Sequence, residues 1–488
     1  MMNFDFTPEQ EMLRQTVRKF VDKEIMPYIK EWDERGEFDR NIFKRLAELN
    51  LMGVCIPEQY GGMGMDYNSL AIVCEELERG DTAFRTAVSV HTGLNSLTLL
   101  QWGTEEQKQK YLPYLATGEK IAAYALTEPG SGSDALGAKT TAKLNAEGTH
   151  YILNGEKQWI TNSGFADVFV VYAKVDGQHF TAFIVERDFP GVSTGPEEKK
   201  MGIKSSSTRT LILQDVPVPK ENVLGEIGKG HVIAFNILNI GRYKLGLGAV
   251  GGAKRALEIT LKYANQRQQF KRPISKFTLT QEKFATMAAR LYAAESSVYR
   301  TVGLFDERMG LLDAEKAKDG KEIAKSIAEY AIECSLNKFF STEVLDYIVD
   351  EGVQIHGGYG FMQEYEIERA YRDSRINRIF EGTNEINRLL IPGTLLKKAL
   401  KGELPLMEKA QSVQESMLEP SFRGSSEEEA PFAQEKRLLE TAKRLFLLVG
   451  GQAVQTYGAK LEDQQEVLAR LADIMIRIYA MESALLQI

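Results

Sequence analysis

The sequence predicts a mainly helical α+β protein in which a β domain separates two helical domains. Apolar residues recur three or four positions apart through most of the first 115 residues, which is the spacing of one face of a helix. Residues 168–175, 180–185 and 210–213 are instead short apolar runs with prolines nearby, as β-strands are. Helical spacing returns at His231 and continues to about residue 400. The length of 488 residues is sufficient for about three domains.

The order of these patterns divides the chain into five segments. We expect an N-terminal helical domain, a middle β domain, a C-terminal helical bundle, a linker and an additional helical region, at residues 1–121, 122–235, 236–400, 401–432 and 433–488. The linker is predicted from its Pro, Ser and acidic content, which resists packing. The final residues, 483–488, carry no cap or polar tail, so the chain is expected to stop inside a helix and to be truncated.

Two local patterns predict where individual elements begin or turn. Thr7 followed by Pro8 predicts the start of the first helix, because Thr caps a helix and Pro suits its first position. Asn154-Gly155 lies between two strand-like runs, 151–153 and 158–160, and predicts a hairpin with a two-residue turn.

Composition and charge argue against several classes of function and location. Acidic residues outnumber basic ones by 68 to 60, which argues against nucleic acid as a partner, because phosphate binding needs a basic face. Cys55, Cys74 and Cys334 form no CxxC pair and are expected to be buried thiols in a reducing compartment. The five histidines have no ligand spacing, so no metal site is predicted. Neither a signal peptide nor an 18-residue apolar run is visible, so a cytoplasmic location is expected.

Two short motifs match nucleotide-binding and hydrolase patterns, but their contexts are wrong. Residues 246–251 fit GxGxxG inside a helical pattern, where a Rossmann site needs a preceding strand; we expect these small residues to let helices pack closely. Residues 191–195 fit GxSxG, but Pro196 and charged residues follow where a nucleophile elbow needs a helix.

Glu381 is the first candidate for a chemical role. It lies in Phe380-Glu381-Gly382-Thr383-Asn384, directly before a helical pattern that includes Ile386, Leu389 and Leu390. A carboxylate held against apolar residues is placed to act as a general base, because burial raises its pKa. The alternative is a helix N-terminal Glu that only complements the helix dipole.

A second candidate is the loop at residues 124–135, which contains Gly, Ser, Thr and Pro directly after an apolar strand. Its exposed N–H and O–H donors suit a polar heterocycle and a phosphate or thioester tail, whereas the alternative is a plain turn. Trp159 and Thr161 lie on a strand of the same domain, and there the alternative is a core Trp.

Five motifs in this order resemble those of the acyl-CoA dehydrogenase family over about residues 1–395. They are L-T-E-P-G-S-G-S-D at 126–134, W-I-T-N at 159–162, R-Q-Q-F at 267–270, Q-I-H-G-G-Y-G-F at 354–361 and F-E-G-T-N at 380–384, with Arg372-Asp373 before the last. The resemblance implies a helical N-terminal domain, a middle β-barrel and a C-terminal helical bundle that holds FAD. It also implies that Glu381 removes the α-proton of an acyl-CoA thioester while a β-hydride passes to the flavin, which yields a trans-2-enoyl-CoA.

The resemblance also implies roles for individual residues. Contacts to the flavin ring are implied for Leu126, Thr127, Trp159 and Thr161. The diphosphate and adenosine side of FAD is implied for Arg267, Phe270, Gln354 and Gly358, and Thr383 and Glu385 would complete the FAD site. Acyl-CoA would contact Ser133, Asn239, Arg242 and Gly382. Because the Arg267 and Gln354 positions act across a subunit interface in the family, a homodimer or tetramer is expected.

Three positions distinguish this sequence within the family. Some relatives carry the base immediately before the residue that matches Arg242; that position is Gly241 here, which leaves Glu381 as the carboxylate at a family base position. Lys271 stands where relatives often have Gly, and this puts the loop geometry there in doubt. His356 is expected to be a packing or solvent-facing residue.

Within the family the sequence looks most like the very-long-chain branch, through residues 198–204, 236–242 and 378–384 and the additional helical region. This likeness favours acyl chains of about a dozen carbons or more, unless Asn95 and Leu99 close the tunnel early. It implies a role in fatty acid β-oxidation with an electron-transfer flavoprotein as acceptor. An acyl-CoA oxidase and a non-catalytic scaffold are the alternatives. For the last region, packing is favoured over membrane association, because it is not markedly basic.

Overall fold

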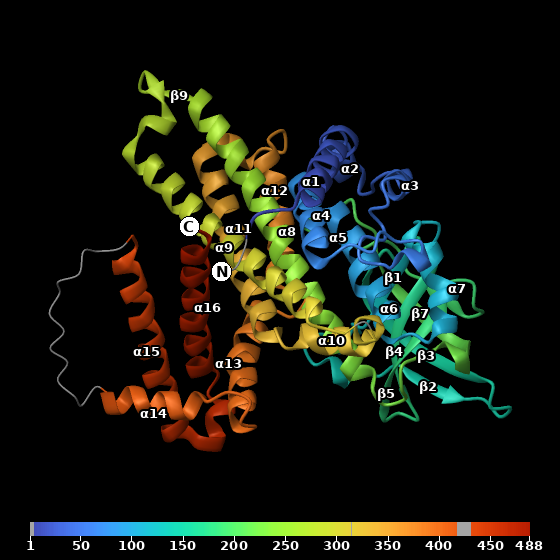
Figure 1. The fold of residues 1–488 in the computed structure, drawn as a ribbon. Helices are drawn as coiled ribbons and strands as arrows, with labels where there is room; N and C mark the ends of the chain where they lie inside the picture. The colour runs from blue at the N-terminus through green and yellow to red at the C-terminus, as the bar shows by residue number, and fades with distance from the viewer. Residues whose placement is uncertain (1–3, 314, 417–430) are drawn as a thin grey trace.

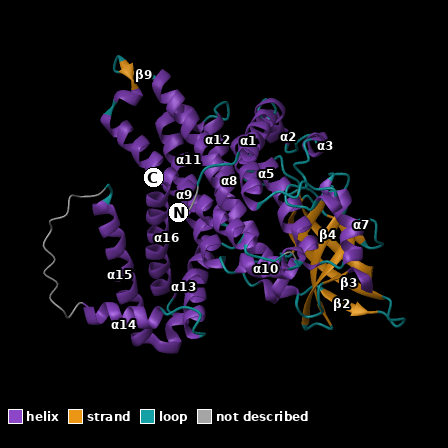
Figure 2. Cartoon of the chain, viewed as in Figure 1, coloured by secondary structure: helices purple, strands orange, loops and turns teal. Residues whose placement is uncertain are grey.

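A computed structural model describes residues 4–313, 315–416 and 431–488 and confirms the mainly helical α+β fold. The β-sheet lies at one end of the molecule and helices α14 and α15 lie at the other, with the long helices α8, α9, α11 and α13 between them (Figure 1). The strands gather in one block, apart from a short pair at a helical tip (Figure 2).

The N-terminal part is helical, as expected. Thr7 caps the first helix through a capping box with Gln10, which confirms its predicted start. A π-helical segment, Val90–Ser96, continues the fifth helix. The helices are α1 (Pro8–Phe20), α2 (Ile29–Arg35), α3 (Asn41–Glu48), α4 (Tyr67–Gly80), α5 (Thr82–Ser89), α6 (Leu97–Trp102) and α7 (Glu105–Ala116).

The middle of the chain forms an eight-stranded sheet in the order β6-β7-β3-β2-β4-β5-β8, with β1 paired to β4 in parallel. A core of Val, Leu, Ala and aromatic side chains packs on this sheet. The strands are β1 (Ala122–Ala125), β2 (Thr141–Leu144), β3 (His150–Thr161), β4 (Val168–Val175), β5 (His179–Glu186), β6 (Val192–Thr194), β7 (Thr208–Pro219) and β8 (Val223–Leu224).

The hairpin expected at Asn154-Gly155 is wrong, because β3 runs through both residues as one strand. The register against β7 shifts between Leu153 and Gly155 because β7 carries the extra residue there, so Asn154 lies opposite a β-bulge. A side chain at Gly155 would collide with Thr140, which explains the glycine without a turn. The serine of the GxSxG match, Ser193, lies on β6, and no helix follows that strand before β7.

Long helices build the C-terminal bundle. Glycines of α8 (Gly230–Gln266) admit close neighbours: Gly246 faces the backbone of Asn337, and Gly251 faces the backbone of Glu75. The GxGxxG match is therefore a helix-packing motif, as expected. The remaining elements are β9 (Gln268–Gln269), β10 (Arg272–Pro273), α9 (Thr278–Gly310), α10 (Gly320–Ala328), α11 (Ala331–His356), α12 (Glu366–Ser374) and α13 (Asn384–Leu400).

The expected linker at 401–432 is partly wrong, because it contains α14 (Leu406–Ser416). Apolar residues at helical spacing let α14 pack against α15 (Ala433–Tyr457), and this packing outweighs the polar composition. The rest of that segment, 417–430, lies outside the described residues. The last helix, α16 (Gln465–Gln487), packs on α13 through an Arg388–Asp473 ion pair of 2.5 Å.

Among the described residues, no helix combines the length and the apolarity needed to cross a membrane. Two of the three cysteines, Cys74 and Cys334, are buried as expected, whereas Cys55 is partly exposed. His356 is a packing residue: its ring stacks on Tyr263 at 4.1 Å between centroids, and its Nδ1 lies 2.7 Å from the Gly352 carbonyl oxygen.

Candidate active site

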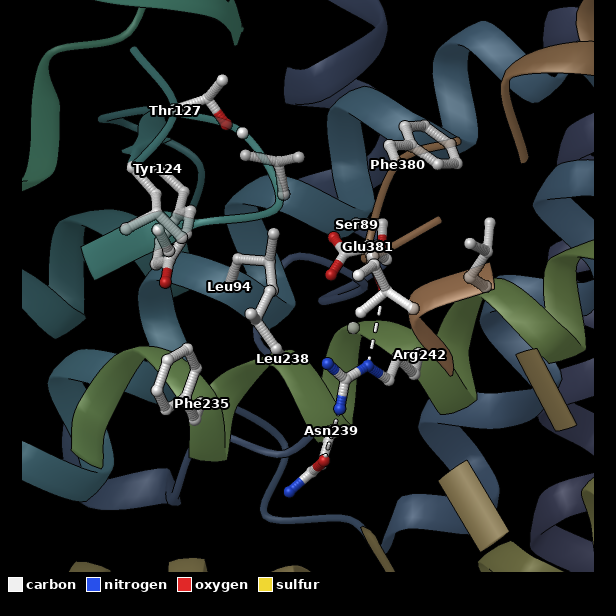
Figure 3. Close-up of a pocket in the computed structure, with 18 of the residues that line it drawn as sticks. Ser89, Leu94, Tyr124, Thr127, Phe235, Leu238, Asn239, Arg242, Phe380 and Glu381 are labelled. Carbon is white, nitrogen blue, oxygen red and sulfur yellow. Dashed lines mark hydrogen bonds between the residues drawn. The ribbon is translucent and has the colours of Figure 1, made fainter. Parts of the chain in front are cut away.

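A cavity of about 550 Å³ lies between the sheet, α5, α8 and the turn before α13. Figure 3 shows Glu381 and Arg242 on one side of it and Tyr124 and Thr127 on another. Nine of the predicted site residues line it: Leu126, Thr127, Ser133, Trp159, Thr161, Asn239, Arg242, Glu381 and Gly382. The structure thus brings together residues from three distant parts of the chain.

Glu381 lies in a strained turn. Its φ is 57°, in the left-handed region that non-glycine residues rarely adopt, and Gly382 follows with a φ of 79°. A left-handed non-glycine residue costs on the order of 1–3 kcal/mol and persists where its surroundings impose it. Thr383 then caps α13 by accepting a hydrogen bond from the Ile386 N–H at 3.2 Å. Such strain at a cavity wall is typical of functional sites.

Three side chains hold this turn from behind. Lys338 Nζ donates to the Gly382 carbonyl oxygen at 2.7 Å, and Asn387 Nδ2 donates to the same oxygen at 2.9 Å. Arg242 Nε points to the Glu381 carbonyl oxygen at 3.4 Å, while its Nη1 donates to Asn239 Oδ1 at 3.1 Å (Figure 3). The carbonyl groups of the turn are therefore occupied. In the described part of the chain, the Glu381 N–H contacts no protein acceptor.

The Glu381 carboxylate is desolvated. Burial raises its pKa above the ordinary value, while the charges of Arg242 and Lys338 act in the opposite direction. Its Oε2 is buried and has no hydrogen-bond partner among the described residues. Gly241 packs against this carboxylate so closely that a side chain there would collide with it. The glycine at the alternative base position thus makes room for Glu381.

The alternative role of Glu381, in which it only complements the dipole of α13, does not fit its position, because Glu381 precedes Thr383, the N-cap of that helix. Glu385 is the acidic residue in the first turn, and hydrogen bonding to its own backbone N–H lowers its pKa. Neither Thr383 nor Glu385 lines the cavity. Their implied FAD contacts stay predictions.

Trp159 lies on the opposite wall. Its side chain is 60% exposed, so the core alternative is wrong. It has a φ of 58° at a bulge in β3, between Lys157 and Ile160, and this bulge turns its ring toward the cavity. An exposed indole at a cavity is a surface on which a flat ring system stacks.

The loop after β1 is held by a buried ion pair that the sequence patterns do not reveal. Lys157 Nζ donates to Glu128 Oε1 at 2.7 Å and to the Leu126 carbonyl oxygen at 3.2 Å. The Glu128 carboxylate also accepts from the backbone N–H of Lys139, at 2.5 Å, and of Thr140, at 3.1 Å. These bonds fix Leu126 and Thr127 at the cavity edge. A plain turn would not need them.

The α5 side of the cavity is polar, since Arg85, Thr86 and Ser89 line it. Arg85 is 3% exposed, lines the cavity, and forms a buried ion pair with Glu78. Gly248 of α8 lies so close to this pair that the first carbon of a side chain there would come within 3.0 Å of Arg85 Nε. Asn95 and Leu99, the two residues considered as an early end of the tunnel, are fully buried and do not line the cavity.

The other predicted cofactor residues lie elsewhere. Arg267 follows α8, 26 positions beyond Gly241, which corresponds to ~39 Å along the helix. Arg267 and Gly358 line a separate surface cavity, Gln354 lies in the last turn of α11, and Phe270 is 88% exposed. One chain therefore does not bring these four residues to Glu381.

Family models match most of the chain. Models for the N-terminal, middle and C-terminal domains of acyl-CoA dehydrogenases match residues 7–119, 123–216 and 228–396. A further model, also described as an acyl-CoA dehydrogenase C-terminal domain, matches residues 441–488.

Individual proteins agree with these matches. A probable acyl-CoA dehydrogenase of Bacillus subtilis is 64% identical over 487 residues, which are 99% of this chain and 81% of that protein. The rat mitochondrial short-chain specific acyl-CoA dehydrogenase is 38% identical over 391 residues, 79% of this chain and 90% of that protein. The crystal structure of an acyl-CoA dehydrogenase with FAD from Bacillus anthracis superposes with a TM-score of 0.96 at 63% identity, and covers 100% of this chain and 82% of that one.

The chain belongs to the acyl-CoA dehydrogenase family of oxidoreductases. The expected very-long-chain branch is not supported. The rat relative is named for short chains, and the name of the Bacillus subtilis relative specifies no chain length.

Proposed function

We propose that the protein oxidises fatty acyl-CoA thioesters to trans-2-enoyl-CoA in fatty acid β-oxidation, with Glu381 as the base that removes the α-proton. One observation supports this proposal most strongly: the buried carboxylate of Glu381 lies in a strained turn at the wall of a cavity. One oxygen of this carboxylate has no hydrogen-bond partner among the described residues. A carboxylate without hydrogen bonds to its oxygen is a stronger base than one in water.

The cofactor is FAD, as in the Bacillus anthracis relative, and the cavity wall fits a flavin ring. The exposed Trp159 indole offers a stacking surface, and Thr127 and Thr161 line the same cavity as hydrogen-bonding groups. When bound, FAD accepts the hydride that leaves the β-carbon. Leu126, held by Lys157 through its carbonyl oxygen, would form the edge of the ring site.

The residues of this chain prepare the α-carbon for deprotonation. The N–H of Glu381 is available to donate to the thioester carbonyl, because it has no acceptor in the described part of the chain. Negative charge that develops on the thioester oxygen is thereby stabilised by a donor that the turn holds in a fixed position. Ser133, Asn239 and Gly382 line the same cavity and are proposed to contact the acyl-CoA.

The buried Arg85–Glu78 ion pair at the α5 wall is expected to limit the length of the acyl chain. Gly241, beside Glu381, and Gly248, beside the Arg85–Glu78 pair, are seven residues apart on α8, a spacing of ~10 Å on the same face. An acyl chain that extends past this point meets a buried ion pair rather than apolar side chains. We therefore place the preferred chain below the dozen carbons expected from the sequence.

The proposal includes a homo-oligomer and an electron-transfer flavoprotein as acceptor. The separation of Arg267, Phe270, Gln354 and Gly358 from the cavity supports their use by a second copy of the chain.

Anaerobic spectroscopy tests the function. Addition of hexanoyl-CoA to the flavin-loaded protein without oxygen should bleach the flavin band, and the bleached protein should reoxidise slowly in air. Rapid reoxidation would instead indicate an oxidase. An unchanged spectrum with hexanoyl-, butyryl- and dodecanoyl-CoA would overturn the proposal and favour the alternative of a non-catalytic scaffold.

A further inference from the structure

Lys338 is a fully buried lysine directly behind the Glu381 turn. It lies on α11, far from Glu381 in sequence, and its Nζ donates to the Gly382 carbonyl oxygen and to Asn384 Oδ1, both at 2.7 Å. Both acceptors are neutral, and no carboxylate among the described residues forms an ion pair with this ammonium. A buried cation without an ion-pair partner is costly and indicates a specific role.

We propose that Lys338 is the positioning residue for Glu381: its ammonium holds the left-handed turn in place and keeps the Glu381 carboxylate ionised in the substrate-free enzyme. This inference rests on the proposed role of Glu381 as the base.

The hydrogen bonds explain how Lys338 positions the turn. The Gly382 carbonyl oxygen accepts from Lys338 and Asn387, so two donors fix the carbonyl group that directly follows the two residues with φ of 57° and 79°. Asn384, the first residue of α13, is bonded in turn to Thr342 Oγ1 at 3.1 Å and to Glu343 Oε1 at 2.7 Å. Lys338 therefore joins the turn and the start of α13 to the interior of α11.

The charges around Lys338 come from four elements. Glu381 in the turn, Glu343 on α11 and Glu385 on α13 favour the ammonium, whereas Arg242 on α8 disfavours it. Lys244 of α8 and Arg85 of α5 are further cations that act on Glu381. Arg242 also reaches the turn, because its Nε points to the Glu381 carbonyl oxygen at 3.4 Å, whereas Lys244 is bonded to Ser89 and Thr92.

This arrangement has a consequence for the pH dependence of the reaction. Burial lowers the pKa of Lys338 to about 7, so its ammonium is present mainly below neutral pH. In that range its charge lowers the pKa of Glu381, against the desolvation that raises it. Flavin reduction requires ionised Glu381, so its rate rises with pH through the pKa of Glu381. Loss of the ammonium raises this pKa and moves the acidic limb of the profile to higher pH.

The test is the pH profile of anaerobic flavin reduction by saturating hexanoyl-CoA, measured on the flavin-loaded protein. Lys338→Gln keeps a donor but removes the charge, and Lys338→Arg keeps the charge. We expect the acidic limb of Lys338→Gln to move up by about one pH unit and that of Lys338→Arg to stay close to the wild-type position.

Lys200 provides the control. Its pKa is also lowered, to about 8, by burial, and its Nζ donates to Thr208 Oγ1 at 2.9 Å, outside the cavity. Lys200→Gln should leave the limb unchanged.

The outcomes separate this inference from the proposed function. If the wild-type protein does not reduce its flavin, the proposed function fails. If it does, a wild-type limb in Lys338→Gln overturns the role of Lys338. If Lys338→Gln does not retain flavin, Lys338→Arg tests the inference instead. An acidic limb of Lys338→Arg that is displaced by as much as one pH unit would contradict the charge effect. An acidic limb at the wild-type position, with flavin retained, would support it.

Discussion

The cavity around Glu381 is built entirely from one chain, whereas the site at the C-terminal tip of α8, near Arg267, is open on the surface of that chain. At the cavity, the sheet, α5, α8, α11 and the turn before α13 converge, and hydrogen bonds fix each wall. At the tip, Arg267 and Gly358 line an open surface site, and the Phe270 ring is 88% exposed. Tyr359 and Met362, which line the same site, are also exposed, and a group of exposed apolar side chains is typical of a surface that another molecule covers.

This difference divides the residues into two functional groups. The residues that would hold the flavin ring and perform the chemistry are positioned within a single chain. The residues implied for the diphosphate and adenosine side are presented outward, ~39 Å along α8 from Gly241. A substitution in one region should therefore leave the other intact.

The largest effect is expected at the base. Glu381→Gln keeps size and hydrogen bonding but removes basicity, so flavin and acyl-CoA binding should survive. A positioned general base contributes ~10²–10⁴-fold in rate, and the upper end is expected for so weak a carbon acid. Stopped-flow flavin reduction measures it, and a rate within about threefold of wild type would exclude Glu381 as the base.

The next effect is expected at the tip. Arg267→Ala should leave a folded protein that purifies with less flavin, because this guanidinium is proposed to hold the FAD diphosphate of the neighbouring subunit. The flavin-to-protein absorbance ratio measures it. Lys276→Ala, a change of another basic residue near the tip, is the control. A full flavin complement in Arg267→Ala would show that this assignment is wrong.

A smaller effect is expected at the α5 wall of the cavity. The double variant Arg85→Met with Glu78→Met removes both buried charges, since removal of one alone would leave the other unpaired. The ratio of kcat/KM for dodecanoyl-CoA to that for butyryl-CoA should rise about tenfold, because a chain of methylene groups then meets apolar side chains. An unchanged ratio would place the end of the acyl chain elsewhere.

The smallest effect is expected at Lys271, which has a φ of 66° where relatives often have Gly. Lys271→Gly relieves the left-handed strain and should raise the free energy of unfolding by ~1 kcal/mol or less, with flavin reduction unchanged. Thermal unfolding of the flavin-free protein measures it. Destabilisation would show that the Lys271 side chain stabilises the tip.

The sequence predicted the two helical parts and the sheet because their apolar spacing is regular over many residues. It failed where a local pattern had two structural meanings. Asn154-Gly155 is typical of a turn, but β3 continues through both residues and pairs there with a bulged segment of β7. The polar composition of 401–432 suggested a linker, but α14 packs against α15 there.

At the site, the motifs located Glu381, Thr127 and Trp159 but not the groups that hold them in place. Lys338 and Lys157 were missed because a single lysine in a helix or strand is usually a solvated residue. Only the packing of α11 against the turn, and of β3 against the loop, shows them to be buried donors. The left-handed backbone of Glu381 was equally invisible, because it is imposed by these distant contacts.

The division of the site between two subunits is tested most directly by combining Glu381→Gln in one subunit with Arg267→Ala in the other. Glu381→Gln and Arg267→Ala subunits, coexpressed with different affinity tags, are purified as the mixed dimer, and flavin reduction by hexanoyl-CoA is measured. If Arg267 serves the neighbouring subunit, one of the two sites has both functional groups, and about half of the wild-type flavin should be reduced at the wild-type rate. If Arg267 serves its own subunit, each site carries one lesion. No rapid reduction would then be seen, and this result would contradict the account.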